Sequence, residues 1–258
     1  MNENSVFQRV ENKYLITAAQ AQKIQMKAEG FLRPDRYAKY TIHSIYYDTS
    51  DSAMVISCLE KPEYKEKLRL RCYGQPHAGT KVFLEIKKKY MDLGNKRRIT
   101  LDIQEAEDYL EHGIPHSVHG QIADEIDYMK NLYSLQKKLY LAYDRMAYAG
   151  INEEDLRITF DYHIRYRTDN LSLYELGNET LMSDSNTVLM EIKAMKRYPM
   201  WLCEILTSMN IYKNSFSKYG AIYSKLQQQK TKEIVIPDMA MQYAKPYAEI
   251  TEGGELHA

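Results

Sequence analysis

Residues 65–71, with the sequence KEKLRLR, alternate positive charges with other side chains. In a β-strand, successive side chains point to opposite faces, so the two leucines lie on one face and four cations on the other. The cationic face would hold Lys65, Lys67, Arg69 and Arg71. Like charges this close repel one another unless a polyanion or facing acids offset the repulsion. A solvated edge strand is the alternative interpretation of this segment taken alone.

The same alternation of charged and apolar residues recurs in seven further segments. These are residues 9–15, 41–48, 81–87, 96–101, 143–145, 157–161 and 188–193. A sandwich with a dry core could place every charged face in water. However, Lys and Arg dominate these faces, and about eight antiparallel strands can close into a barrel wide enough for one ligand. We predict an α+β fold in which a closed antiparallel barrel of about eight strands forms a basic tunnel flanked by helices.

Helices are predicted to pack on the apolar outer faces of these strands. Thr17 and Gln20 have capping-box spacing and would open a helix that runs to about residue 28. Four more helices are predicted at about residues 103–112, 121–133, 199–209 and 218–229. We expect residues 1–230 to form one domain and residues 231–258, which contain two prolines and a Gly-Gly pair, to form a loosely packed tail.

The composition excludes several classes of protein. Lys plus Arg and Asp plus Glu both number 35, so overall charge does not indicate binding to nucleic acid. The three cysteines lack CxxC spacing, which argues against a disulfide framework and against a thiolate zinc site. No apolar stretch has the length of a membrane span or the form of a signal peptide. We expect a cytoplasmic protein with no transmembrane segment and no nucleic acid partner.

A cationic tunnel with a few carboxylates suits one class of ligand. Arg and Lys bind phosphate oxygens, and isolated carboxylates hold a divalent cation that bridges those oxygens. Polyphosphate or the triphosphate of a nucleotide fits this description. The sequence contains neither GxxxxGK[ST] nor GxGxxG, so it has no signature of a P-loop or a dinucleotide fold.

Eight short motifs occur in a fixed order along the chain. They are ENKY at 11–14, YYD at 46–48, KLRLR at 67–71, LEIK at 84–87, YDR at 143–145, RITFD at 157–161, MEIK at 190–193 and SFSKY at 215–219. Their ordered set resembles the polyphosphate polymerase (VTC) domain of the triphosphate tunnel metalloenzyme superfamily, over residues 7–226. The resemblance implies an antiparallel tunnel enzyme that transfers the γ-phosphoryl group of ATP to a growing polyphosphate chain. It also implies a divalent metal, with Mn²⁺ preferred and Mg²⁺ as the alternative.

The resemblance also assigns roles to individual residues. It implies catalytic, phosphate-contacting roles for Arg69, Arg71, Lys87, Arg145, Arg157 and Lys218. It implies substrate-binding roles for Lys13, Lys96, Tyr143 and Ser217, and a metal-binding role for Glu191. Strand alternation adds Lys67, Arg98 and Lys193 as substrate-binding candidates and Glu85 as a second metal candidate. Ser215 stands where some members of the family carry a lysine.

Two other functions stay open beside the polymerase. Tunnel enzymes of this architecture also include metal-dependent triphosphatases and polyphosphatases, whose residue types overlap with those of a polymerase. The third hypothesis is a noncatalytic polyphosphate-binding module. The partners expected from the residues are therefore ATP and polyphosphate.

Overall fold

The computed structural model describes residues 9–91, 93–175, 177–195 and 197–242, with side chains as far as Lys232. The strands are β1 (Arg9–Thr17), β2 (Leu32–Asp48), β3 (Tyr64–Tyr73), β4 (Lys81–Tyr90), β5 (Leu93–Asp102), β6 (Gln136–Gly150), β7 (Arg157–Arg167), β8 (Thr180–Leu181) and β9 (Thr187–Met195). The helices are α1 (Ala18–Lys27), α2 (Ala53–Leu59), α3 (Ile103–His112), α4 (Gln121–Leu132), α5 (Met200–Ser208) and α6 (Lys218–Gln242).

The strands form one antiparallel sheet with the order β1-β9-β7-β6-β2-β3-β4-β5, and the short strand β8 pairs with β7. Among the described strands, β1 pairs only with β9 and β5 only with β4, so hydrogen bonds between strands do not close the sheet. The sheet nevertheless curls, and it brings Glu11 on β1 within 3.9 Å of Lys87 on β4. The α+β antiparallel architecture is confirmed, but the closed barrel is not. The two ends of the sheet approach through charged side chains instead of backbone pairing.

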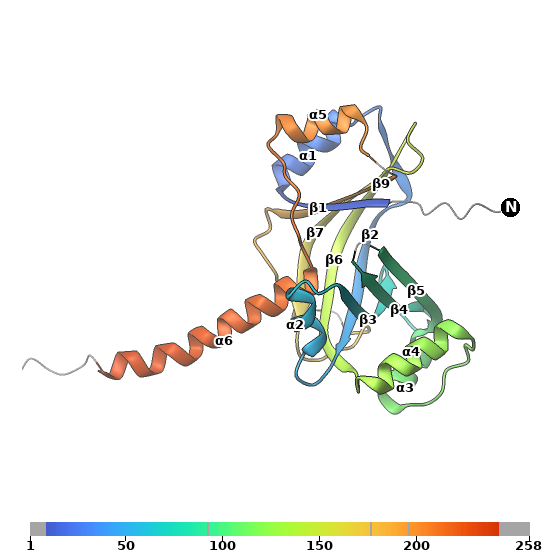
Figure 1. The fold of residues 1–258 in the computed structure, drawn as a ribbon, viewed down its shortest axis with the longest axis vertical. Coiled ribbons are helices and arrows are strands. Elements are labelled where there is room, and N and C mark those ends of the chain that lie inside the picture. The colour runs from blue at the N-terminus through green and yellow to red at the C-terminus, as the bar shows by residue number, and fades with distance from the viewer. Residues whose placement is uncertain (1–8, 92, 176, 196, 243–258) are drawn as a thin grey trace, which may run out of the picture.

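The outer face of the curled sheet is apolar and covered by helices, as predicted. Helices α3 and α4 pack Ala106 and Ile126 against a cluster that includes Leu84 of β4. Helices α1 and α5 pack Ile24 and Leu202 against the outer faces of β1, β7 and β9. Figure 1 shows these two helix pairs at opposite ends of the sheet.

Four of the predicted helices agree with the structure to within a residue or two. Thr17 and Gln20 form both hydrogen bonds of the predicted capping box at the start of α1. Helices α1 and α3 each begin with a capping box, formed by Thr17 and by Asp102, which the sequence displays directly.

One end of the inner face is apolar, although we predicted a basic tunnel. Helices α2 and α6 cover it, and Val55 of α2 and Ile222 of α6 pack against Leu141, Ile164 and other inner side chains. The sequence did not indicate α2, which is short and has no side-chain cap from its own N-cap residue. Helix α2 instead begins against β2, because its backbone N–H groups donate to the carboxylate of Asp48.

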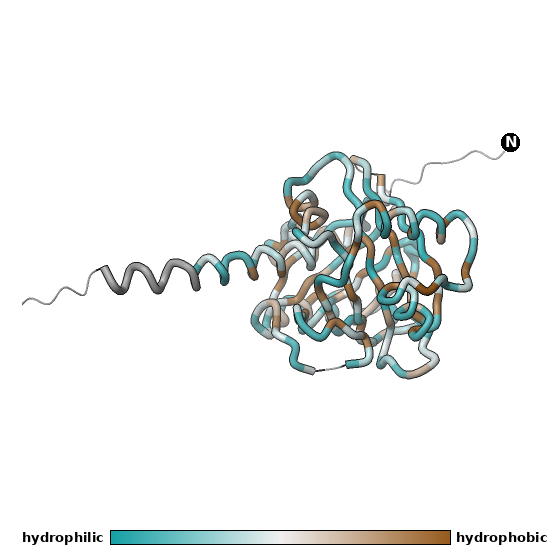
Figure 2. Tube along the Cα trace, turned by 90° about the horizontal axis from the view of Figure 1, so that it is seen from below, coloured by the Kyte–Doolittle hydropathy of each residue, from teal (hydrophilic) through white to brown (hydrophobic). Residues whose placement is uncertain are grey.

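Helix α6 is longer than predicted and continues to Gln242. Residues 231–242 therefore belong to this helix, within the segment where we expected a loosely packed tail. The first turns pack on the sheet through Tyr219 and Ile222, and the helix then extends away from it (Figure 2). Residues 243–258 lie outside the described part, so the loosely packed tail and the domain boundary stay predictions. None of the described helices combines the length and apolar character needed to cross a membrane.

Candidate active site

The register of β3, β4 and β5 aligns charged side chains in rows across the inner face. Across β3, β4 and β5, Arg69 lies opposite Glu85, and Glu85 lies opposite Arg98. The next row along these strands holds Lys67, Lys87 and Lys96 in the same way. Because alternate residues share a face, each row repeats after two positions, about 7 Å along the strand.

Glu85 is the centre of one group of charges, which we call the Glu85 cluster. It comprises Glu85, Arg69, Arg71, Lys96 and Arg98. Glu85 Oε2 accepts a hydrogen bond from Arg69 Nε at 2.8 Å, and Oε1 lies 2.6 Å from Lys96 Nζ. The carboxylate is only 1% exposed. Burial alone would raise its pKa, but Arg69, Arg71 and Lys96 lower the pKa to about 2. One buried carboxylate thus orients several cations without neutralising them all.

Side chains from β2 and β6 hold the two arginines of this cluster. Arg69 Nη1 donates to the hydroxyl of Tyr46 at 3.2 Å, and Arg71 Nε donates to Ser44 Oγ at 3.2 Å. Arg71 also donates to the hydroxyl of Tyr143 at 3.4 Å. Burial would raise the pKa of Tyr46, but the Arg69, Arg71 and Lys67 charges lower it to about 7. Tyr46 is therefore poised to ionise within the physiological range.

Asp161 of β7 is the centre of a second group, which we call the Asp161 cluster. Its fully buried carboxylate accepts hydrogen bonds from Arg145 at 2.6 and 2.8 Å and from Lys218 Nζ at 2.6 Å. Burial alone would raise the pKa of Asp161, but the Lys218 and Arg145 charges lower it. Lys218 Nζ also lies 4.2 Å from the ring centre of Tyr143. Since Tyr143 accepts from Arg71, it joins the two clusters.

The third charged group lies on β1 and β9. Lys193 Nζ is 2.5 Å from Glu191 Oε1 and 3.9 Å from Glu11, while Lys13 Nζ donates to the carbonyl oxygen of Phe216 at 3.0 Å. Burial and the nearby Lys218 charge lower the pKa of Lys13 to about 8. Burial would raise the pKa of Glu191, but Lys193 and Lys13 lower it. Glu191 is therefore an ionised, largely buried carboxylate at neutral pH.

The protein's own side chains do not form a complete metal cage. Within the described ranges, no three His, Cys, Asp or Glu side chains gather at one point. Mg²⁺ and similar hard cations commonly use one or two carboxylates and complete their shell with substrate phosphates and water. Glu191 fits that role, because within the described ranges Lys193 is the one cation in an ion pair with it. Glu85 fits it less well, since several cations already surround its oxygens.

The start of α6 brings a further predicted residue, Ser217, to the inner face beside Lys67 of β3. Lys67 Nζ donates to Ser217 Oγ at 3.0 Å, directly before Lys218. Ser217 Oγ also accepts from the backbone N–H of Gly220 at 3.3 Å, and so caps the helix. Arg157, the first residue of β7, lies opposite Lys193 of the third group but pairs with none of the carboxylates of the three groups among the described residues. Its guanidinium pairs with Asp35 at 3.9 Å and donates to backbone carbonyls.

Several inner-face residues were absent from the predicted site, although their strand positions pointed inward. Asp161, Tyr46, Ser44 and Glu11 all share a face with predicted site residues. Alternation identified their face, but it did not reveal their partners. The contact between Lys13 and a backbone carbonyl leaves no signal in the side-chain pattern.

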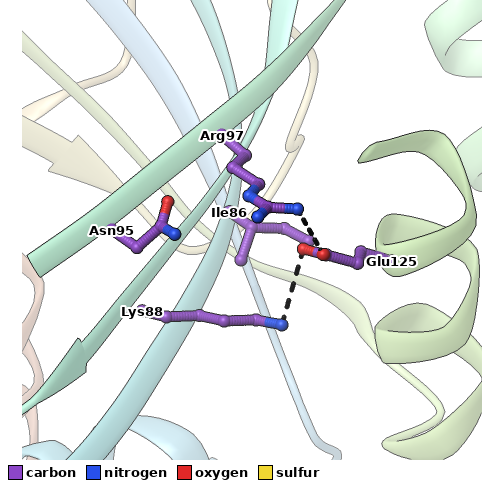
Figure 3. A pocket seen from close by; sticks show the side chains of 5 residues that line it. All are labelled: Ile86, Lys88, Asn95, Arg97 and Glu125. Atoms are coloured by element: carbon purple, nitrogen blue, oxygen red, sulfur yellow. Dashed lines mark hydrogen bonds and ion pairs between the residues drawn. The ribbon is translucent and has the colours of Figure 1, made fainter. Parts of the chain in front are cut away.

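Neighbouring cations on β4 and β5 point away from the site. Lys88 and Arg97 lie on the outer face, where both pair with Glu125 of α4, at 3.6 and 2.5 Å (Figure 3). They line a pocket of about 210 Å³ with Ile86 and Asn95. This placement agrees with strand alternation, and it excludes these two cations from the inner-face site.

Comparison with protein families identifies the domain. The model of the VTC domain matches residues 8–227. The chain belongs to the VTC domain family. This match confirms the resemblance drawn from the ordered motifs. No curated protein matches the sequence.

Solved structures with the same fold are distant in sequence. An adenylate cyclase candidate from Bacillus halodurans is 16% identical, with a TM-score of 0.51 over 81% of this chain and 93% of that one. An adenylyl cyclase candidate from Hippeastrum, described as having a dominant triphosphatase activity, is 14% identical. Its TM-score is 0.50 over 84% of this chain and 96% of that one. These likenesses show that the VTC domain shares the fold of such proteins.

Proposed function

We propose that the protein is an ATP-dependent polyphosphate polymerase that transfers the γ-phosphoryl group of ATP to a polyphosphate chain. The supporting observation is the excess of positive charge on the inner face of a chain whose net charge is zero. The cations on or facing this surface include Lys13, Lys67, Arg69, Arg71, Lys87, Lys96, Arg98, Arg145, Lys193 and Lys218. The carboxylates among them are Glu11, Glu85, Asp161 and Glu191. Such an uncompensated surface suits a polyanion.

Phosphoryl transfer needs positioned reactants and neutralised charge more than a protein nucleophile. In our proposal, the Arg69 and Arg71 guanidinium groups hold phosphate oxygens, since each is fixed by Glu85 or by hydroxyl groups. Arg145 and Lys218 supply charge from the opposite wall, held by Asp161. Glu85 and Asp161 then position cations, and we favour this role for Glu85 over metal binding.

The low basicity of the inner-face carboxylates favours phosphoryl transfer to polyphosphate over hydrolysis of ATP. A water nucleophile needs a general base, whereas the terminal phosphate of polyphosphate is already ionised. Nearby cations lower the pKa values of Glu85, Asp161 and Glu191, which makes each a weak base. Glu11, the fourth carboxylate of the inner face, lies 3.9 Å from both Lys87 and Lys193, so it too is paired with cations.

The divalent metal that the family implies would be held by Glu191 together with substrate phosphates. When bound, it would neutralise developing charge on the phosphate oxygens. Mn²⁺ is the proposed ion and Mg²⁺ the alternative. Lys13 and Lys193 flank Glu191 and would contact the same phosphates.

The experiment incubates the purified protein with ATP and Mn²⁺, with and without a short polyphosphate primer. Products are resolved on a polyphosphate-stained gel, and orthophosphate is assayed in parallel. We expect a long polymer and ADP. Orthophosphate without polymer would instead support a triphosphatase, the activity described for the Hippeastrum protein. ATP binding without turnover would support a binding module.

A further inference from the structure

Thr159 of β7 carries a buried hydroxyl that the described residues leave without a hydrogen-bond partner. Because alternate residues of a strand share a face, Thr159 lies on the inner face with Arg157 and Asp161. A buried polar atom without a partner is unfavourable, and native proteins keep few of them outside sites that bind water, an ion or a ligand. This hydroxyl is therefore a candidate for a role in the inner-face site.

The register of the sheet gives Thr159 two cross-strand neighbours. Glu191 of β9 lies directly opposite on one side, and Ala147 of β6 lies opposite on the other. Side chains in directly opposite positions have Cβ atoms about 4.5–5.5 Å apart, so bond rotation brings a hydroxyl within reach of a carboxylate. Ala147 has no polar side-chain atom. Of the two neighbours, Glu191 is thus the one whose side chain accepts a hydrogen bond.

Glu191 has a different partner in this structure. Its Oε1 lies 2.5 Å from Lys193 Nζ, and the residue is only 8% exposed. The proposed function assigns Lys193 to the substrate phosphates and Glu191 to the divalent metal. A carboxylate that binds a metal is itself held by hydrogen bonds from outer side chains. Once Lys193 turns to the phosphates, Glu191 needs another donor to hold it.

We infer that Thr159 positions Glu191 for the metal. When Lys193 contacts the phosphates, Thr159 Oγ1 donates a hydrogen bond to the Glu191 carboxylate and fixes its orientation. This inference rests on the proposed function and adds to it a residue that touches neither the metal nor the phosphates. It assigns two opposite effects to one hydroxyl, which destabilises the free protein and strengthens metal-dependent binding.

The test replaces the hydroxyl by a methyl group in Thr159→Val. This change removes the unpartnered polar atom, so the melting temperature of the free protein should rise by about 2–4 °C. Calorimetric titrations with tripolyphosphate are run with and without Mn²⁺. We expect the affinity measured with Mn²⁺ to fall about tenfold and the affinity measured without it to stay unchanged. Thr159→Ser, which restores a hydroxyl, should recover most of the Mn²⁺-dependent affinity.

Thr41→Val is the matched control, because it makes the same chemical change on the outer face. Thr41 Oγ1 donates to Asp144 Oδ1 at 2.9 Å, so the variant loses a hydrogen bond and its melting temperature should fall. Its tripolyphosphate affinity should match that of the wild type with and without Mn²⁺. If Thr159→Val does not fold, Thr159→Ala removes the same hydroxyl and carries the Mn²⁺ comparison.

Four results would overturn the inference. They are an unchanged affinity with Mn²⁺ in Thr159→Val, an equal loss with and without Mn²⁺, a wild-type affinity that does not depend on Mn²⁺, and a fall in melting temperature as large as that of Thr41→Val. The last result would show that the hydroxyl is already paired in the free protein.

The polymer gel decides the proposed function separately. Polymer formation by the wild type, with unaltered Mn²⁺-dependent binding in Thr159→Val, would refute only the role of Thr159. A selective loss of Mn²⁺-dependent binding in the variant, without polymer from the wild type, would refute only the polymerase.

Discussion

Lys218, the first residue of α6, donates a hydrogen bond from Nζ to Asp161 Oδ2 of β7 at 2.6 Å. The helix that covers the apolar end of the inner face therefore also delivers a cation to the candidate phosphate site. Ser217, one residue earlier, accepts from Lys67 on the opposite wall. Stability and ligand binding are consequently linked through the start of α6.

The Asp161 cluster leads to a prediction about stability. Asp161→Asn should lower the free energy of unfolding at pH 7 by about 3 kcal/mol or more, because it leaves buried Arg145 and Lys218 without their counter-charge. Urea denaturation measures the change. Glu125→Gln, which breaks two ion pairs on the outer face, is the control and should cost less than about 1 kcal/mol. Equal losses in the two variants would contradict the assignment.

Arg69 should contribute to both ligand binding and stability. Arg69→Ala should weaken tripolyphosphate binding by about 1.5–3 kcal/mol, the range for a charge-assisted hydrogen bond. It should also destabilise the free protein, because Glu85 is buried and loses its closest guanidinium partner. Calorimetry and thermal melting measure the two effects. Arg97→Ala, at an outer-face position of β5, is the matched control, and unchanged tripolyphosphate affinity in Arg69→Ala would count against the site.

The pKa of Glu85 predicts an acid-dependent loss of stability. In the folded protein this pKa is lowered to about 2 from an ordinary value of 4.5. The stabilisation by ionised Glu85 is therefore complete above about pH 4.5 and disappears as the pH falls toward 2. Unfolding free energies of the wild type and Glu85→Gln, measured between pH 2 and 6, should converge at the acidic end. A constant difference across this range would show that Glu85 does not titrate in this way.

Tyr46 and Lys13 predict how ligand binding depends on pH. Tyr46, with a pKa of about 7, gains a negative charge as the pH rises, and Lys13, with a pKa of about 8, loses its positive charge. Both changes reduce the positive charge of the inner face, so tripolyphosphate affinity should fall between pH 6 and 9. Tyr46→Phe should remove the part of this fall near pH 7. Tyr47→Phe, at the next position on the outer face, should retain the wild-type profile, which controls for ionisation of the ligand itself.

Glu191 should be required for metal-dependent turnover. Glu191→Gln keeps the size of the side chain but removes the anionic ligand, so we expect polymer synthesis with Mn²⁺ to fall about 100-fold, roughly 2.7 kcal/mol. Circular dichroism should show an unchanged fold. Glu125→Gln serves again as the control. Near-normal Mn²⁺-dependent synthesis in Glu191→Gln would exclude this residue as the metal ligand.

Much of the site was predictable because strand alternation is a local property. The period of two places Arg69, Arg71 and Glu85 on one face and Lys88 and Arg97 on the other, and the structure confirms this division. Capping signals likewise predict α1 from Thr17 and Gln20. The ordered motifs identified the family, which the match over residues 8–227 confirms.

The partners of these side chains were not predictable, because they depend on strand order and on packing between distant segments. Nothing in the neighbourhood of Lys218 indicates that it would meet Asp161, and nothing around Asp48 indicates that it would begin α2. The inner-face parity of Ile42 and Leu141 was readable, but their cover by α2 and α6 was not.

The sequence alone determined which side chains share a face, because backbone geometry imposes that period on every strand. Only the tertiary structure decided that hydrogen bonds leave the sheet open between β1 and β5, that helices cover one end of its inner face, and that buried carboxylates hold the cations in clusters. These features arise from the balance of burial, charge and chain connectivity over the whole molecule. No single segment contains that balance.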